Sequence, residues 1–388
     1  MFNIILLGIT SLLTDISTEM VYPLLPIYLV QQLGVSPVIL GFIEGIAESL
    51  SSLFKVFSGH FSDKLRSRKP FAIFGYSFSA IGKLFLYLST NWHAVFAART
   101  IDRFGKGIRT APRDALIAEN AHPAKRGAAF GLHRAMDTIG AATGVLLAYF
   151  LITSDQRSFK NIFLISLIPA VLAVLFLFFV KEKGKEVVKR LAPPKLEWQK
   201  LNPRLKLFLI FTLVFTLGNS SNQFLLLRAK DSGSSIHKVL LFYLFYNIVY
   251  ALTAYPAARL SDKIGRRKIL VWGYFFYGLV YLGFAMNKAA GNFWFLFGLY
   301  GLYIGFTEGV EKALLVDVAP RELKATVIGL HATLVGLGLF PASFLAGLLW
   351  KFLGASAPFY FGGIIGIAAS ICLWFVLSLP EARIGQGV

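Results

Sequence analysis

The chain has 388 residues, of which 56% are hydrophobic and only 15% are charged. A water-soluble domain needs roughly a quarter of its residues charged, and disordered chains are poor in aromatic residues, whereas this chain has 37 Phe. The composition therefore excludes both classes and indicates a polytopic membrane protein. We expect the net charge of +19 to reflect Lys and Arg in loops on one side of a bilayer, and not a nucleic-acid surface.

Twelve apolar stretches are long enough to cross a bilayer, which takes about 20 residues per helix. The first lacks a small-residue cleavage site, so we expect a retained helix and not a signal peptide. The single cysteine, Cys372, excludes a disulfide framework and a cysteine-based zinc site. The predicted spans are residues 2–31, 36–60, 70–90, 93–118, 124–153, 160–180, 207–228, 236–260, 268–287, 291–317, 325–350 and 357–379.

One connection differs from the short loops between the other spans. Residues 181–206 hold nine Lys or Arg, three Glu and three Pro, which is typical of a solvated linker. This linker predicts an N-terminal bundle over residues 1–180 and a C-terminal bundle over residues 207–388. Lys and Arg are concentrated in the loops after the second, fourth, sixth, eighth and tenth spans, so we expect these loops and both termini to be cytoplasmic.

The two halves repeat each other at one offset. Equivalent residues lie 198 or 199 positions apart, and each half contains six spans. A repeat of half the chain length is typical of a transporter built from two parallel bundles. The matched pairs are Asp63 with Asp262, Glu119 with Asp317, Arg126 with Lys324, and His133 with His331.

Residues 59–69 read GHFSDKLRSRK and residues 258–268 read ARLSDKIGRRK. Both resemble the loop signature of the major facilitator superfamily, although Arg66 and Ala258 stand where that signature has glycine. The resemblance covers the whole chain. It implies an all-α membrane protein whose twelve transmembrane helices form two pseudo-symmetric six-helix bundles. It also implies a cytoplasmic gate that favours an outward-facing state, formed by Gly59, Asp63, Arg68, Asp262, Gly265, Arg266 and Arg267.

Two further segments resemble a narrower branch of that superfamily. Residues 14–26 read TDISTEMVYPLLP and residues 102–114 read DRFGKGIRTAPRD, similar to bacterial facilitators grouped with nickel-resistance and drug exporters. The resemblance implies export of a drug-like molecule, a metal ion or a metal complex across a bacterial inner membrane. The chain ends EARIGQGV, without the His-rich tail of some relatives, and this disfavours a metal substrate.

Charged residues inside the predicted spans point to function, because ionisable groups at bilayer depth are costly and must face protein or water. The first half has six acids and six bases, and the spacing is helical. Asp15, Glu19 and Tyr22, for example, share one helix face. For any single residue the alternative is a static ion-pair network. The twelve residues are Asp15, Glu19, Glu44, Glu48, Asp102, Asp137, Lys55, Lys83, Arg99, Arg103, Lys106 and Arg134.

Carboxylates four residues apart repel each other when both are ionised, which favours binding of a proton. The proton-coupling candidates are Asp15, Glu19, Glu44, Glu48 and Asp137. The second half offers neutral hydrogen-bonding and aromatic side chains that suit recognition of a solute. The substrate-cavity candidates are Tyr22, Asp102, Arg103, Lys106, Arg134, Asn219, Asn222, Tyr243, Asn247, Glu308 and Glu311.

We therefore expect a monomeric secondary transporter that works by alternating access. We expect it to use the proton gradient to export a small solute and to have no metal site and no cofactor. His133 and His331 are explained by matching helix starts, and Gly105 and Gly107 by close helix approach and not by a phosphate loop. A uniporter or importer, a channel or receptor, and a membrane-embedded enzyme acting on a lipid or isoprenoid stay open as alternatives. For the enzyme, the nearest catalytic cluster is Asp102, Asp114 and Glu119.

Overall fold

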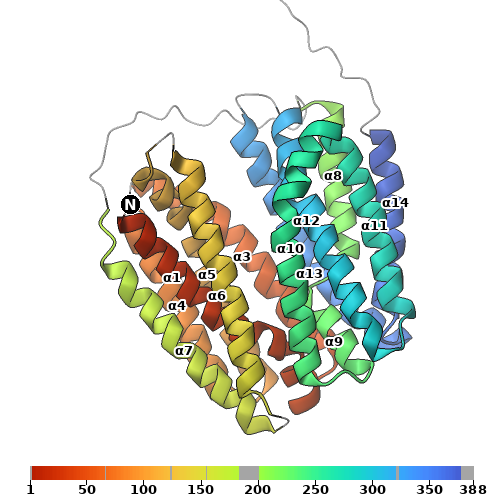
Figure 1. Ribbon diagram of the computed structural model, residues 1–388, viewed down its shortest axis with the longest axis horizontal. Coiled ribbons are helices and arrows are strands. Elements are labelled where there is room, and N and C mark those ends of the chain that lie inside the picture. Colours follow the sequence, from red (N-terminus) through yellow and green to blue (C-terminus); the bar gives the residue numbers. More distant parts are fainter. Residues whose placement is uncertain are drawn as a thin grey trace, which may run out of the picture.

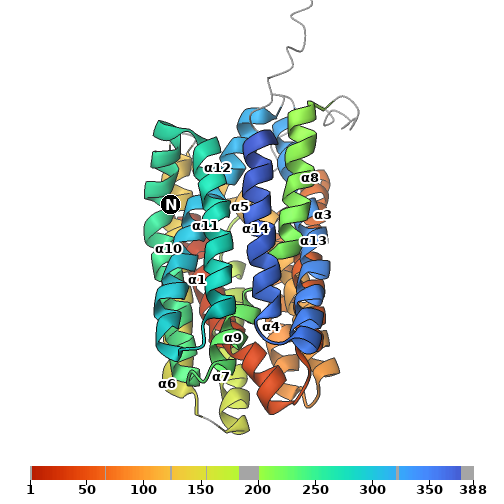
Figure 2. The ribbon, with the colours of Figure 1, turned by 90° about the vertical axis from the view of Figure 1, so that its right-hand side faces the viewer.

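The computed structural model describes residues 2–65, 67–122, 125–153, 155–182, 201–319 and 323–376, and these residues form helices and loops without a β-strand. Figure 1 shows two bundles, α1 to α7 and α8 to α14, standing beside each other. Figure 2 looks onto the second bundle, where α10, α11, α14 and α8 stand upright. Most of the predicted linker, residues 183–200, lies outside the described residues.

The twelve predicted spans are confirmed, but the first and the seventh are each divided into shorter helices. The first contains α1 (Phe2–Val21), η1 (Tyr22–Leu24), α2 (Leu25–Ile27) and η2 (Tyr28–Gln32). The seventh contains α8 (Pro203–Gly218) and α9 (Gln223–Asp231). The others are α3 (Pro37–Leu65), α4 (Lys69–Leu88), α5 (Trp92–Asn120), α6 (Arg126–Leu151), α7 (Gln156–Phe178), α10 (Ile236–Ile264), α11 (Arg266–Met286), α12 (Phe293–Val318, after η5, Ala290–Asn292), α13 (Lys324–Leu353) and α14 (Ala357–Val376).

Ten segments of the described chain are long and apolar enough to cross a membrane on those grounds alone. The two helices that complete the twelve are α5 and α6. Helix α5 is 29 residues long and carries eight charged residues, so it lacks the apolar run that marks a typical span. Its charged side chains must therefore be satisfied inside the protein or in a water-filled cavity.

The packing within one half is repeated in the other. Helix α1 packs against α6 and α7 as α8 packs against α13 and α14, and α3 packs against α5 as α10 packs against α12. Between the halves, α3 contacts α13, and α6 contacts α10, which are equivalent pairs under the same symmetry. This arrangement confirms the two pseudo-symmetric six-helix bundles.

Glycines allow α5 to lie unusually close to its neighbours. A Cβ atom on Gly105 would lie 2.5 Å from the carbonyl oxygen of Gly75 in α4, and one on Gly107 would lie 2.9 Å from the carbonyl oxygen of Ser51 in α3. Only residues without a side chain allow such an approach. The close packing confirms the interpretation of this glycine pair and brings the charges of α5 within reach of side chains on α3 and α4.

The halves meet at one end of the molecule and separate at the other. We define the basic end as the end where α3 stops at Leu65 and α11 starts at Arg266. At the opposite end the halves are in close contact: a Cβ atom on Gly41 of α3 would lie only 2.1 Å from the carbonyl oxygen of Ser343 of α13. Toward the basic end, Gly131 of α6 and Gly329 of α13 face open space, and the ribbons diverge (Figure 1).

Candidate functional site

Two helices are interrupted at corresponding positions of the two halves. The first span changes to a 3₁₀ turn at Tyr22, directly before Pro23, and the seventh is unwound between Gly218 and Gln223. Tyr22 and Ser220 are 198 positions apart, which is the offset of the repeat. Interrupted membrane helices expose backbone polar groups, and they are tolerated only where protein or a cavity satisfies those groups. The two breaks therefore indicate a binding region.

A cavity of about 380 Å³ lies at these breaks, between the two halves. This volume is within the usual range for small-molecule sites, about 300–1,000 Å³. One wall is charged and comes from α1, α3 and α5, whereas the other is neutral and comes from the second half. The cavity is lined by Asp15, Thr18, Glu19, Tyr22, Glu48, Asp102, Arg103, Lys106, Arg109, Asn219, Ser220, Ser221, Asn222, Tyr243, Tyr300, Ile304 and Leu339.

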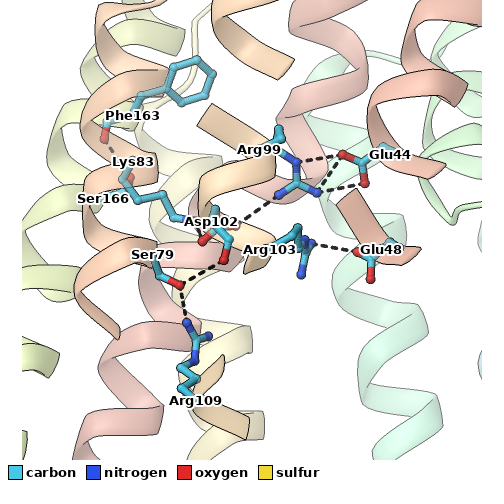
Figure 3. Close-up of polar contacts among 10 residues, drawn as sticks. All are labelled: Glu44, Glu48, Ser79, Lys83, Arg99, Asp102, Arg103, Arg109, Phe163 and Ser166. Atoms are coloured by element: carbon cyan, nitrogen blue, oxygen red, sulfur yellow. Dashed lines mark hydrogen bonds and ion pairs between the residues drawn. The ribbon is translucent and has the colours of Figure 1, made fainter. Parts of the chain in front are cut away.

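Behind the charged wall lies a buried network of ion pairs (Figure 3). The Arg99 guanidinium donates two hydrogen bonds to the Glu44 carboxylate, at 2.8 and 2.9 Å. The Lys83 ammonium lies 3.2 Å from Asp102, and Arg99 reaches the same carboxylate at 3.4 Å. All four side chains are at most 6% exposed. Since each charge has an opposite partner, this network neutralises itself and braces α3, α4 and α5 together.

At the cavity surface, the charged groups have fewer partners. Arg103 reaches Glu48 at 3.1 Å through one nitrogen, while its buried Nε has no hydrogen-bond partner. The hydroxyl of Tyr243 donates a 2.9 Å hydrogen bond to Glu19, and this bond joins the two halves. The ring of Tyr243 also lies 5.9 Å from the ring of Tyr22.

A second link between the halves lies nearer the basic end. The Arg134 guanidinium donates to the Tyr250 hydroxyl at 2.6 Å, and that hydroxyl donates to Glu308 at 2.7 Å. The Lys312 ammonium completes the chain at 2.9 Å from Glu308. Arg134 and Glu308 were predicted to line the cavity, but they form this separate cluster and do not contribute to the cavity wall.

The predicted gate residues form two equivalent clusters at the basic end. In the first half, Arg68 pairs with Asp63 and with Glu119. In the second half, Arg266 lies 3.1 Å from Asp262 and 2.6 Å from Asp317. Each of these ion pairs joins residues of one half, so the pairs do not link the two halves at the basic end.

Three other gate residues shape the same region. A Cβ atom on Gly59 would lie 3.3 Å from Ala111, and Gly265 ends α10 with a φ of 97°. This φ favours glycine because other side chains rarely adopt it. Arg267 donates to the carbonyl oxygen of Trp374 at 2.9 Å and lies over its ring.

The remaining candidates lie away from the cavity lining. Glu44 is buried behind it, and Asp137 lies 3.4 Å from His133. The Asn247 amide donates to the carbonyl oxygen of Tyr243 on its own helix. His331 lies 2.8 Å from Glu311. Both histidines of the repeat, His133 and His331, therefore contact a carboxylate.

The three carboxylates that the sequence offered as a possible catalytic cluster pair with different basic residues. Asp102 pairs with Lys83, Asp114 pairs with Arg113, and Glu119 pairs with Arg68. No group of three or more His, Cys, Asp or Glu in the described residues has metal-binding geometry. Asp102, Asp114 and Glu119 therefore do not form one cluster in the structure.

The sequence prediction missed several residues that line the cavity. Arg109 continues the spacing of Arg99, Arg103 and Lys106 along α5, and this spacing could have identified it. Tyr300 had no such signal, because it lies among other aromatics in an apolar span. The other missed lining residues are Thr18, Ser220, Ser221, Ile304 and Leu339.

Comparisons with known proteins place this geometry in a family. The model of the Major Facilitator Superfamily matches residues 7–228 and 207–386. The MFS-type transporter MJ1317 of Methanocaldococcus jannaschii is 39% identical over 380 residues, covering 96% of this chain and 94% of that protein. The multidrug resistance protein MdtH of Cronobacter sakazakii is 24% identical, covering 98% of this chain and 95% of that protein.

Solved structures agree with the fold. The nucleoside transporter NupG has a TM-score of 0.82 at 14% identity, covering 98% of this chain and all of that chain. A D-xylose–proton symporter has a TM-score of 0.73 at 17% identity, covering 98% of both chains. The family match spans nearly the whole sequence and both bundles, and the chain therefore belongs to the major facilitator superfamily, a family of membrane transporters.

Proposed function

We propose that this protein is a proton-coupled secondary transporter that exports a small solute by alternating access. The basic end faces the cytoplasm in this proposal, in keeping with the concentration of Lys and Arg in its loops. The cavity then opens toward the cytoplasm and is closed on the outside, so the structure corresponds to an inward-facing state. Export is supported by the relation to a multidrug resistance protein.

The contact between Glu19 and Tyr243 is the observation that carries the proposal. Glu19 lies 17 residues into α1, about 25 Å along a helix that rises 1.5 Å per residue. Its carboxylate faces the cavity, and it accepts a hydrogen bond from the other half. A proton on Glu19 would weaken this bond, because a charged acceptor binds a donor more strongly than a neutral one. Proton binding is thereby linked to the contact between the halves.

The other carboxylates differ in how well they suit this role. Glu44 and Asp102 are buried and paired with bases, and Glu48 is paired with Arg103. A proton on any of these would leave a buried base without its counter-ion, which is strongly unfavourable. Asp15, one helical turn from Glu19, forms no ion pair with any described residue. Glu19, with Asp15 beside it, is therefore the better proton site.

The test uses proteoliposomes containing the full-length protein and a labelled solute chosen by thermal-shift screening of the purified protein. An imposed pH gradient should drive accumulation through the wild type. Glu19→Gln should abolish gradient-driven accumulation but retain counterflow exchange, since glutamine keeps the shape and loses the titratable proton. Asp231→Asn, at an exposed carboxylate that does not line the cavity, is the matched control.

Two outcomes would contradict the proposal. If gradient-driven accumulation in Glu19→Gln equals that of the wild type, Glu19 is not the proton site. If the wild type itself equilibrates the solute without responding to the gradient, the protein is a uniporter.

A further inference from the structure

The cavity contains two opposite charges that form no ion pair. Lys106 of α5 and Asp15 of α1 both line it. Neither side chain forms a hydrogen bond or an ion pair with any residue that the structure describes, although their charges interact at longer range. Every other charged group in the lining is bound to a partner side chain.

Water can enter and solvate these two charges while the cavity is open. In an alternating-access cycle the cavity must close on the solute, and closure removes that water. A charge left without a partner in a dry site costs several kcal/mol. The transported species, or a proton, must therefore compensate both charges before the cavity can close.

Beside Lys106 there is a second unfilled hydrogen-bond donor. Arg103, one turn away on α5, is 3% exposed, and its Nε has no partner. Two cationic donors on one helix face can bind a carboxylate or a similar anionic group. On α1, Asp15 and Glu19 can bind an ammonium group in the same way. The cavity thus has an anion-binding and a cation-binding side.

Charge balance distinguishes a zwitterion from a solute of one sign. The ionisable residues in and directly behind the lining comprise five acids and five bases, so the cavity is neutral when all are ionised. A simple anion would leave Asp15 uncompensated unless a proton also bound there, and a simple cation would leave Lys106 uncompensated. A zwitterion supplies a partner to both and adds no net charge.

We propose that the solute is zwitterionic, with its anionic group held by Lys106 and Arg103 and its cationic group held by Asp15 and Glu19. This inference rests on the proposed function, because it concerns the solute of the same cavity. The rings of Tyr22, Tyr243 and Tyr300 also line the cavity, so a solute with an aromatic or apolar middle portion fits best. A proton at Glu19 or Asp15 competes with the solute's ammonium group, which yields exchange of proton for solute.

The experiment measures thermal stabilisation of the purified full-length protein by probes matched in shape but not in charge. Each set has a zwitterion, its methyl ester as the cation, and its N-acetyl derivative as the anion. The scaffolds are phenylalanine, tyrosine, tryptophan, and dipeptides of these residues. We expect the zwitterions to stabilise the wild type most, and the esters and N-acetyl derivatives to bind about tenfold to a hundredfold more weakly, because each lacks one charged contact.

Two variants should change the preference in opposite directions. Lys106→Gln should favour methyl esters over zwitterions, and Asp15→Asn should favour N-acetyl derivatives. Lys106→Arg should retain the preference for zwitterions, which separates loss of charge from loss of folding. The matched controls are Lys238→Gln and Asp231→Asn, at exposed residues that do not line the cavity.

Several results would overturn the proposal. In the wild type, the proposal fails if the esters or the N-acetyl derivatives stabilise the protein as well as or better than the zwitterions, or if no zwitterion stabilises it. It also fails if Lys106→Gln reduces the stabilisation by all three probe types equally. The measurement uses no proton gradient, so such a result rejects the solute class alone. Failure of the proton-coupling test on Glu19 rejects the proposed function instead.

Discussion

Removing the Tyr243 hydroxyl should shift the protein away from the inward-facing state. Tyr243→Phe keeps the ring that packs near Tyr22 but deletes the hydrogen bond to Glu19, which is 2.9 Å long and joins the halves. A hydrogen bond to a charged group contributes about 1.5–3 kcal/mol. If the bond exists only in the inward-facing state, its loss should change the ratio of the two states about tenfold to a hundredfold.

Distances between spin labels can report this ratio. One label at Phe150 and one at Lys238, in a variant whose exposed Cys372 is replaced by serine, lie on α6 and α10 at the closed end. The neighbouring rings of Tyr149 and His237 are 5.2 Å apart across the halves, so the labels should be close in this state. Pulsed electron paramagnetic resonance should show a longer-distance population growing in Tyr243→Phe.

Acidification and a matched variant test the physical reason. When Glu19 is protonated, the lost bond is a neutral one of about 0.5–1.5 kcal/mol, so the effect of Tyr243→Phe should shrink. Tyr300→Phe removes a 2.7 Å bond to Asn222 within the second half, and it should leave the distances unchanged. If Tyr243→Phe leaves the distribution unaltered, or if Tyr300→Phe shifts it equally, the Glu19 contact does not set the balance between states.

Two further changes test the wall behind the cavity. Arg99→Met should destabilise the protein by about 3–5 kcal/mol, because it leaves Glu44 buried and unpaired. Reversible unfolding of the purified protein measures this loss. Adding Glu44→Leu should restore most of the stability, and no recovery would argue against the ion pair as the cause. Gly105→Val should separate α5 from Gly75 of α4 and abolish transport even where the protein remains in the membrane. Uptake normalised to membrane-inserted protein measures this. Normal uptake would show that the close approach of the two helices is dispensable.

The sequence alone determined the twelve spans and the two-bundle architecture. The hydrophobic thickness of a bilayer sets the length of each apolar stretch, and the repeat at half the chain length sets the symmetry. The span over residues 93–118 was among the twelve, although the eight charged residues of α5 hide it from a stricter apolar criterion. Helical spacing also predicted that Asp15, Glu19 and Tyr22 share a face, and all three line the cavity.

Only the tertiary structure decided which charges are paired. Helical periodicity shows which residues share a face of one helix, but not which residue of another helix lies opposite. Arg99 and Glu44 are 55 positions apart, and their pairing depends on how closely the glycines of α5 let it approach α3 and α4. The structure thereby separated the self-neutralising network from Asp15, Glu19 and Lys106, which line the cavity outside that network.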